Sequence, residues 1–189
     1  MITFTELGRL GRLGNQLFQY AALRGLALEK KYESKIPRMS ERQWHGQNCL
    51  LEEFSIESPF LEVEDLQKIK FRYHEVDHMN YDSNFYNIPD NCDLVGFFQS
   101  IHYFEGHQEQ IKKELTPKAK HLQRAKETLN SLKREHPDHE IISFHVRRGD
   151  NTDYTDSSQI ALRNFFNKGS GFDKYVERVL EHFKDRKVK

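Results

Sequence analysis

The chain has 189 residues, of which 37% are hydrophobic and 31% are charged, and its 29 basic and 29 acidic residues leave no net charge at pH 7. A general nucleic-acid binder carries a basic excess, so the balance disfavours that class. The apolar share is low, but the 14 phenylalanines and 8 tyrosines can supply a core. These aromatic residues disfavour wholesale disorder. No apolar run is long enough to span a membrane, and no signal peptide is readable at the amino terminus.

Two cysteines occur, Cys49 and Cys92, and neither belongs to a C-x-x-C pair. We therefore expect two free thiols and a reducing, cytoplasmic compartment, with peripheral membrane association left open.

The amino-terminal segment predicts a strand, a glycine-rich turn and a helix. Residues 1–7 predict a short strand, and Gly8, Gly11 and Gly14 then exclude a regular element and indicate a tight turn. From Asn15, which can serve as the N-cap, apolar residues recur at helical spacing. A unit of this kind opens many α/β nucleotide-binding folds.

The middle of the chain gives weaker signals. Residues 35–48 and 81–93 are polar and predict loops. Residues 61–69 predict a weak helix, and residues 71–76 predict a strand. The compact apolar run Leu94–Phe98 predicts a buried strand.

The later segments alternate between helix and strand. Residues 105–135 predict two surface helices broken near Pro117. Residues 140–146 predict a buried strand of the parallel type. Residues 172–183 predict the clearest amphipathic helix of the chain.

The segment Gly11–Gln16 is the first that could carry chemistry. Glycines let the backbone approach a ligand, and a helix N-terminus presents free N–H groups with partial positive charge. Arg12 adds a guanidinium that fits a phosphate, and Asn15 and Gln16 can hydrogen bond to a sugar or a base. The spacing matches neither G-x-G-x-x-G nor the P-loop. A tight strand–helix turn with a surface arginine therefore stays open as the alternative.

The segment His145–Asp150 is the second segment that could carry chemistry. It lies at the end of the strand expected over residues 140–146, where ligands bind in open α/β sheets. Arg147 and Arg148 could neutralise a diphosphate without a metal, and such a leaving group needs positive charge as its bond to a sugar breaks. Asp150 could orient an arginine or receive a proton. A solvated charge cluster and an Arg-Gly-Asp adhesion tripeptide are the competing interpretations.

The sequence contains no D-x-D pair and no group of histidines and cysteines at metal-ligand spacing. We therefore expect neither a metal site nor a cofactor.

Three segments together resemble the α-1,2-fucosyltransferases, glycosyltransferase family 11. Gly11–Ala21 is similar to the amino-terminal signature of that family, and Gly96–Phe104 is similar to its G-Y-F-Q-S-x-x-Y-F stretch. His145–Asp150 matches the H-x-R-R-x-D motif shared by α-1,2-, α-1,6- and protein O-fucosyltransferases. The segments occur in family order and at family-like separations.

The resemblance implies an α/β fold of the GT-B type with Rossmann-type domains. The expected domains are residues 1–137 and the beginning of a nucleotide-sugar-binding domain over residues 138–189. Family members extend further than this chain, so we expect the second domain to be incomplete.

The implied reaction is inverting, metal-independent transfer of L-fucose from GDP-β-L-fucose to the 2-hydroxyl of a galactoside. Arg147, Arg148 and Gly149 would bind the diphosphate, and His145 and Asp150 would shape the site as its catalytic residues. Asp150 is the candidate base, with holding an arginine in place as its alternative role. Donor or acceptor would also contact the glycine loop, through Arg12, Gly14, Asn15 and Gln16.

The implied partners are GDP-fucose and a galactose-terminated glycan, with no nucleic acid. A non-catalytic remnant that binds a sugar nucleotide or a glycan is the alternative function. Self-association through the last helix is compatible with either.

Overall fold

The computed structural model describes residues 1–189 except 41, 45, 79 and 146–171. The described residues pack as two units, Met1–Leu122 and Gln123–Lys189. The predicted domain boundary at residue 137 stays a prediction. Among the described helices, none has both the length and the apolar character needed to cross a membrane.

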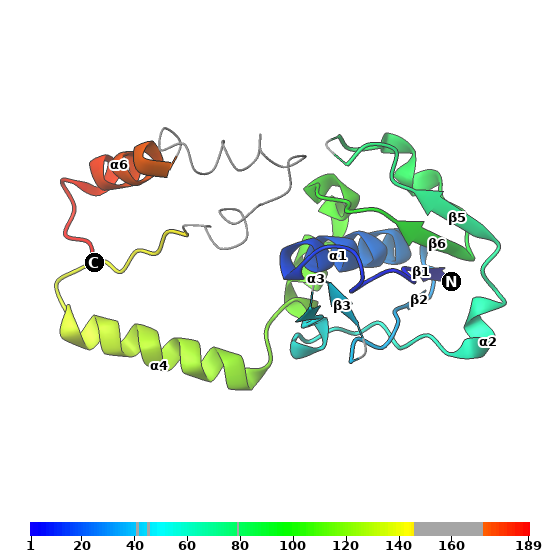
Figure 1. The fold of residues 1–189 in the computed structure, drawn as a ribbon, viewed down its shortest axis with the longest axis horizontal. Helices are drawn as coiled ribbons and strands as arrows, with labels where there is room; N and C mark the ends of the chain where they lie inside the picture. The colour runs from blue at the N-terminus through cyan, green and yellow to red at the C-terminus, as the bar shows by residue number, and fades with distance from the viewer. Residues whose placement is uncertain (41, 45, 79, 146–171) are drawn as a thin grey trace. The chain divides into compact units, whose positions relative to one another are not determined.

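A four-stranded sheet organises the first unit (Figure 1). Its strands lie in the order β2 (Ser34–Lys35), β1 (Ile2–Thr3), β6 (Cys92–Val95) and β5 (Phe71–His74). All neighbouring pairs are parallel. A parallel sheet with helices between its strands confirms the predicted α/β class.

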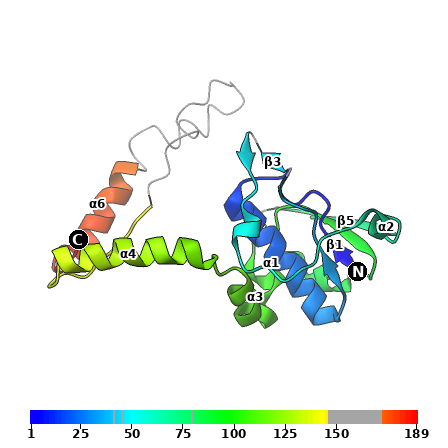
Figure 2. The ribbon, with the colours of Figure 1, turned by 90° about the horizontal axis from the view of Figure 1, so that it is seen from below.

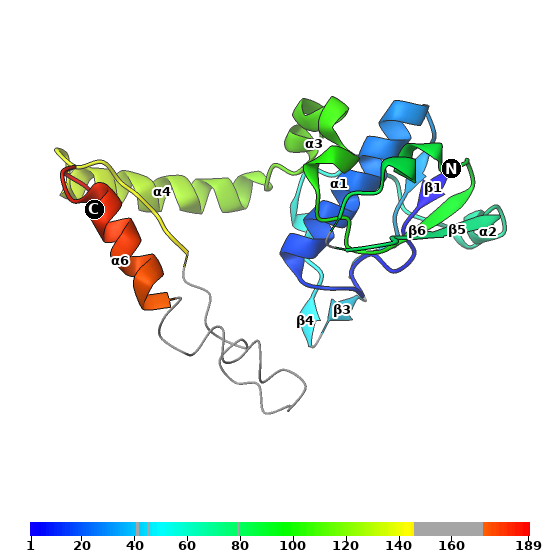
Figure 3. The same cartoon turned by 90° about the horizontal axis from the view of Figure 1, so that it is seen from above.

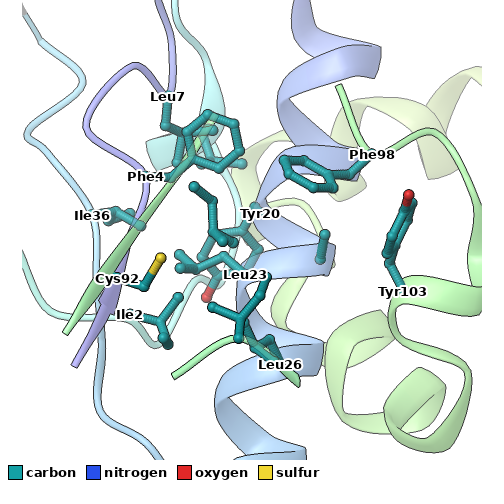
Figure 4. Close-up of a cluster of buried hydrophobic side chains, with 14 of the residues drawn as sticks. Ile2, Phe4, Leu7, Tyr20, Leu23, Leu26, Ile36, Cys92, Phe98 and Tyr103 are labelled. Atoms are coloured by element: carbon teal, nitrogen blue, oxygen red, sulfur yellow. The ribbon is translucent and has the colours of Figure 1, made fainter. Parts of the chain in front are cut away.

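Helix α1 (Leu13–Lys30) supplies the other half of the core. Figure 4 shows Tyr20, Leu23 and Leu26 of α1 pointing towards the side chains of β1 and its neighbours. The aromatic part of the core includes Phe4 and Phe98, whose rings meet edge to face with centroids 5.8 Å apart. Each such fully buried side chain contributes about 1.5–3 kcal/mol to folding.

Short elements surround this core. The hairpin of β3 (Gln43–Trp44) and β4 (Gln47–Asn48) lies next to the first turn of α1 in Figures 2 and 3. Helix α3 (Gln108–Glu114) lies beside α1 in the same two views. The remaining elements are α2 (Val63–Leu66) and the 3₁₀ turns η1 (Leu51–Glu53), η2 (Ser83–Asn87), η3 (Ile101–Tyr103) and η4 (Glu105–His107).

Three predicted boundaries are wrong in detail. The helix expected from Asn15 begins at Leu13, with Arg12 at the N-cap position. The loop expected over residues 35–48 contains the β3–β4 hairpin, because Gly46 at φ 73° permits its tight turn. The strand expected over residues 94–98 ends at Val95.

Glu75 explains the early end of β6. Its carboxylate accepts hydrogen bonds from the backbone N–H groups of Phe97 and Phe98, at 2.6 and 2.9 Å. Both amides are thereby drawn out of the sheet ladder. Gly96 makes this possible, since a Cβ there would lie 2.4 Å from the Cβ of Glu75.

Helices α4 (Ala119–Glu135) and α6 (Phe172–Phe183) match the predicted surface and amphipathic helices. Most of α4 and all of α6 belong to the second unit.

The buried strand predicted over residues 140–146 is not formed in its described part, 140–145. Glu140 makes an isolated parallel bridge to Val188, and Phe144 is 43% exposed. A strand needs neighbours that pair with its backbone groups. Among the described residues of this unit, the backbone partners of Glu140 and Ile142 come from the short segment 187–189.

A buried ionic cluster fastens α1 to α3. The Glu114 carboxylate, 1% exposed, accepts hydrogen bonds from Arg24 Nε and Nη2 at 2.7 and 2.6 Å and from the Tyr20 hydroxyl at 2.5 Å. Burial alone would raise the pKa of Glu114, but the hydrogen bonds from Arg24 and Tyr20 outweigh it and hold the pKa below its usual value. Burial, together with Glu114, raises the pKa of Tyr20 to about 12.

Replacing Glu114 with glutamine is expected to lower the free energy of unfolding by about 3 kcal/mol, because it removes the close carboxylate partner of the Arg24 guanidinium and leaves it only Glu57, at 3.7 Å. The ordinary pKa of a glutamate carboxyl group is 4.5. A lowered pKa means that the contribution of Glu114 is present above this value and is lost as the pH falls through the lowered pKa. The difference in the free energy of unfolding between the wild type and Glu114→Gln should therefore become smaller in acid.

Urea unfolding at pH 7 and pH 4 measures both effects. Glu109→Gln, at an exposed position of the same helix, is the control and should change stability by less than about 0.5 kcal/mol. Equal losses in the two variants would contradict the role given to Glu114.

Candidate functional site

The carboxyl ends of β1 and β6 lie next to each other in the sheet. The chain leaves β1 through the glycine loop, residues 4–12, and leaves β6 through a second loop, residues 96–100. In open α/β sheets, ligands bind at this edge. Both loops belong to segments that the sequence singled out.

Asp93 fixes the first residues of the glycine loop. This side chain of β6 is fully buried and accepts hydrogen bonds from the backbone N–H and the hydroxyl of Thr5, both at 2.7 Å. Arg72 of β5 reaches the same carboxylate at 3.1 Å. The start of the loop is thereby tied to two other strands.

Two of the three glycines in this region, Gly8 and Gly11, are required by the fold. Gly8 and Gly11 have φ angles of 84° and 80°, which strain any residue with a Cβ. A Cβ at Gly11 would also lie 2.2 Å from Asn15 Nδ2.

Gly14 differs from both, because its φ lies outside the left-handed region and nothing lies within 4 Å of a Cβ built there. Glycine inside a helix is less favourable than alanine by about 0.5–1 kcal/mol. The fold does not explain this glycine, whereas close approach of a ligand to the first turn of α1 would.

Gln19 joins the two loops. Its side chain is fully buried, and Nε2 donates to the carbonyls of Leu10 and Gly96, each at 3.0 Å. A second, exposed hydrogen bond joins the loop after β6 to the first turn of α1, where Gln99 Nε2 donates to Asn15 Oδ1 at 2.5 Å. The glycine loop, the first turn of α1 and the loop after β6 therefore form one assembly.

Gln16 is part of the same scaffold. It is 2% exposed, its Nε2 donates to the Gly11 carbonyl at 3.1 Å, and its Oε1 accepts from the Cys49 thiol at 3.1 Å. Burial raises the pKa of Cys49, so this thiol is a poor nucleophile. Both cysteines are free and buried, which confirms the prediction of two free thiols.

The amino end of α1 carries the partial positive charge of its helix dipole. Arg12 at the N-cap position makes no side-chain capping hydrogen bond, and the first turn contains no acidic residue. The predicted N-cap role of Asn15 is wrong, because Asn15 lies inside this turn and bonds to Gln99. A helix end of this kind favours electronegative groups.

A cleft of about 340 Å³ opens beside this helix end. The glycine loop and α1 supply one part of its lining, namely Arg12, Leu13 and Gln16. The β3–β4 hairpin and the segment after it supply the other part, namely Gln47, Asn48 and Leu50. Gln47 and Asn48 are exposed amides that can both donate and accept, which suits sugar hydroxyls.

The hairpin residues of this cleft were missed by sequence reasoning, and so were Gln19 and Gln99 as site residues. The polar pair Gln47–Asn48 after a glycine was the available signal for the hairpin. Gln19 and Gln99 lie inside segments that resemble the family, but their bonds depend on a contact between loops far apart in sequence.

The second predicted segment is described only at its first residue. His145 is exposed and belongs to the second unit. Arg147, Arg148, Gly149 and Asp150 lie outside the described residues. The structure thus brings Arg12, Gly14, Asn15 and Gln16 together, and the meeting of this group with His145–Asp150 stays a prediction.

Gln19→Leu tests the assembly. Removing the amide leaves two backbone carbonyls with a lost partner, so the free energy of unfolding should fall by about 1–3 kcal/mol. Trypsin should also cut after Arg9 and Arg12 several times faster. Gln67→Leu, at an exposed position after α2, is the control, and equal cleavage rates in both variants would refute the bridging role.

Comparison with known proteins supports the resemblance seen in the motifs. The family model described as glycosyl transferase family 11 matches residues 3–189. Searches of curated proteins and of solved structures give no match. The match spans nearly the whole chain and includes all three motif segments, so this protein belongs to glycosyl transferase family 11 and is a glycosyltransferase of the fucosyltransferase type.

Proposed function

We propose that the protein transfers L-fucose from GDP-β-L-fucose to the 2-hydroxyl of a galactoside, with inversion and without a metal. The observation that carries this proposal is the family match over residues 3–189, which contains both the glycine loop and the H-x-R-R-x-D segment. The α/β unit with its parallel sheet supports the first domain of a GT-B arrangement.

The donor is assigned to the second motif. Arg147 and Arg148 would place two guanidinium groups against the diphosphate, and Gly149 would let the backbone approach it. Negative charge grows on the diphosphate as its bond to fucose breaks, so fixed cations there stabilise the transition state more than the ground state.

Inversion requires a single displacement at the anomeric carbon. The acceptor hydroxyl forms the new bond as the diphosphate leaves, and a base removes the hydroxyl proton. Asp150 is the proposed base, with His145 shaping the same site.

The sugar is assigned to the cleft at the amino end of α1. Gly14 leaves room for close approach, and the positive helix end attracts hydroxyl and phosphate oxygens. Arg12, Gln47 and Asn48 line the cleft and offer donors to those oxygens. Self-association and peripheral membrane association stay predictions.

The test is calorimetric titration of GDP and GDP-fucose into the full chain, followed by a transfer assay with lactose in EDTA. The wild type should bind GDP, and the double variant Arg147→Ala, Arg148→Ala should weaken binding by at least about 100-fold, because it removes two charged hydrogen-bonding groups. The matched control is Lys133→Ala, Arg134→Ala, which removes an adjacent exposed basic pair from α4 and should leave binding unchanged.

Absence of GDP binding, or equal loss in both double variants, would refute the proposed donor site. Binding without transfer would assign the chain to the class of non-catalytic sugar-nucleotide binders.

A further inference from the structure

A second cleft, of about 370 Å³, lies at the carboxyl ends of β1 and β2. Residues that follow β1, including Thr5 and Arg9, form one wall, and Arg38, which follows β2, belongs to another. Arg42 completes a set of three arginines in its lining. This cleft shares no lining residue with the cleft at the amino end of α1.

Arg42 carries a positive charge that its neighbours only partly balance. Its Nη1 donates to the carbonyls of Thr5 and Leu7, at 2.6 and 3.1 Å, and its side chain is half-buried. Burial first, and the nearby Arg9 second, lower the pKa of Arg42, while Glu6 acts in the opposite direction. Among the described residues, neither Arg9 nor Arg42 forms an ion pair with a carboxylate. Two like charges held close together in this way favour a bound anion.

Arg38 can take part in the same site. Its Cζ lies 4.8 Å from the centroid of the Phe60 ring. Its Nη2 forms an ion pair with Glu62 Oε1 at 3.4 Å, and both side chains are more than 60% exposed. Exposed pairs of this kind contribute little, so Arg38 can exchange Glu62 for a ligand oxyanion at small cost. The cleft then presents three guanidinium groups against the carboxylates of Glu6 and Glu62.

The opposite part of the cleft is apolar. Pro37, Leu61, Val63 and Leu66 line it, and Val63 and Leu66 are 73% and 50% exposed. A pyranose ring offers an apolar C–H face as well as polar groups, and a ligand pocket typically combines an apolar lining with a few polar groups. The combination fits an acidic sugar better than a free inorganic ion.

The two clefts open on one continuous stretch of chain. Thr5, Glu6 and Arg9 line the arginine cleft, and Arg12 and Leu13, only a few residues further, line the other. The segment that leads through the β3–β4 hairpin also contributes to both, with Arg42 in one and Gln47 in the other. The same stretch of chain therefore borders both clefts, as a single oligosaccharide that occupied both would require.

We infer that the cleft of Arg9, Arg38 and Arg42 binds the anionic group of an acidic sugar, in an acceptor glycan whose neighbouring galactose occupies the α1 cleft. The inference rests on the proposed function for the identity of the ligand as an acceptor. It predicts that a carboxylated, sulfated or phosphorylated glycan is a better acceptor than a neutral galactoside such as lactose.

The test is an NMR titration of the full chain with D-galacturonate and, separately, with D-galactose, at constant ionic strength. Galacturonate should bind at least about fivefold more tightly than galactose, since it adds a charge-assisted contact. The double variant Arg9→Gln, Arg38→Gln should bring this ratio close to one. Arg42 is left in place because it also holds the glycine loop.

Lys70→Gln is the matched control. Lys70 is an exposed cation just before β5, at the amino end of the strand on the far edge of the sheet, so its loss should not change the ratio. A ratio near one in the wild type, no binding of galacturonate, or an equal effect of Lys70→Gln would overturn the inference.

A GDP titration of the same proteins separates the two ligands. GDP binding that survives in the arginine double variant supports an acceptor site, whereas its loss would assign the cleft to the donor diphosphate and overturn the inference. A wild type that fails to bind GDP refutes the proposed function, while the galacturonate ratio still decides whether the cleft binds an anionic sugar.

Discussion

The two hydrogen bonds of Gln19 are the contact on which the rest of the site depends. One buried amide nitrogen has two hydrogens, and it gives one to the loop after β1 and one to the loop after β6. The amide that reaches both carbonyls is itself fully buried. The position of the first turn of α1 is therefore set relative to two neighbouring strands at once. A site assembled from separate loops acquires in this way the precision of a rigid element.

The far part of α1 is held just as firmly. Arg24 and Tyr20 converge on Glu114 of α3, and Gly25 allows the η3 turn to approach the helix so closely that a Cβ would lie 2.4 Å from the Tyr103 carbonyl. Helix α1 is thus held in place along its length, and its amino end carries Arg12 and the exposed Gly14. Gly14, which the fold does not explain, and the uncapped helix end both lie beside the cleft lined by Arg12, Leu13 and Gln16. Stability elsewhere in the unit allows the ligand-facing turn to keep features that cost stability locally.

Sequence reasoning reached the elements whose signals are local. The strand before Gly8, the helix after the glycine loop, the break near Pro117 and the amphipathic helix of residues 172–183 all follow from periodicity and turn residues. It failed where a distant partner decides the outcome. The strand β6 ends at Val95 because the Glu75 carboxylate accepts from the amides of Phe97 and Phe98. Residues 140–145 pair, within the part of the chain that the structure describes, only with the short segment 187–189. The arginine cleft was also out of reach, because Arg9 and Arg38 meet only through the order of β1 and β2 in the sheet.

If the loops joined by Gln19 form the substrate site, bound substrates must protect their backbone amides. Hydrogen exchange of the full chain, with and without GDP-fucose and a galactoside acceptor, tests it most directly, since it follows every backbone amide without altering a residue. We expect slower exchange in peptides covering residues 8–16 and 96–100, and no change in the peptide covering β5 at the sheet edge. Unchanged exchange in both loops, with protection confined to other parts of the chain, would contradict it.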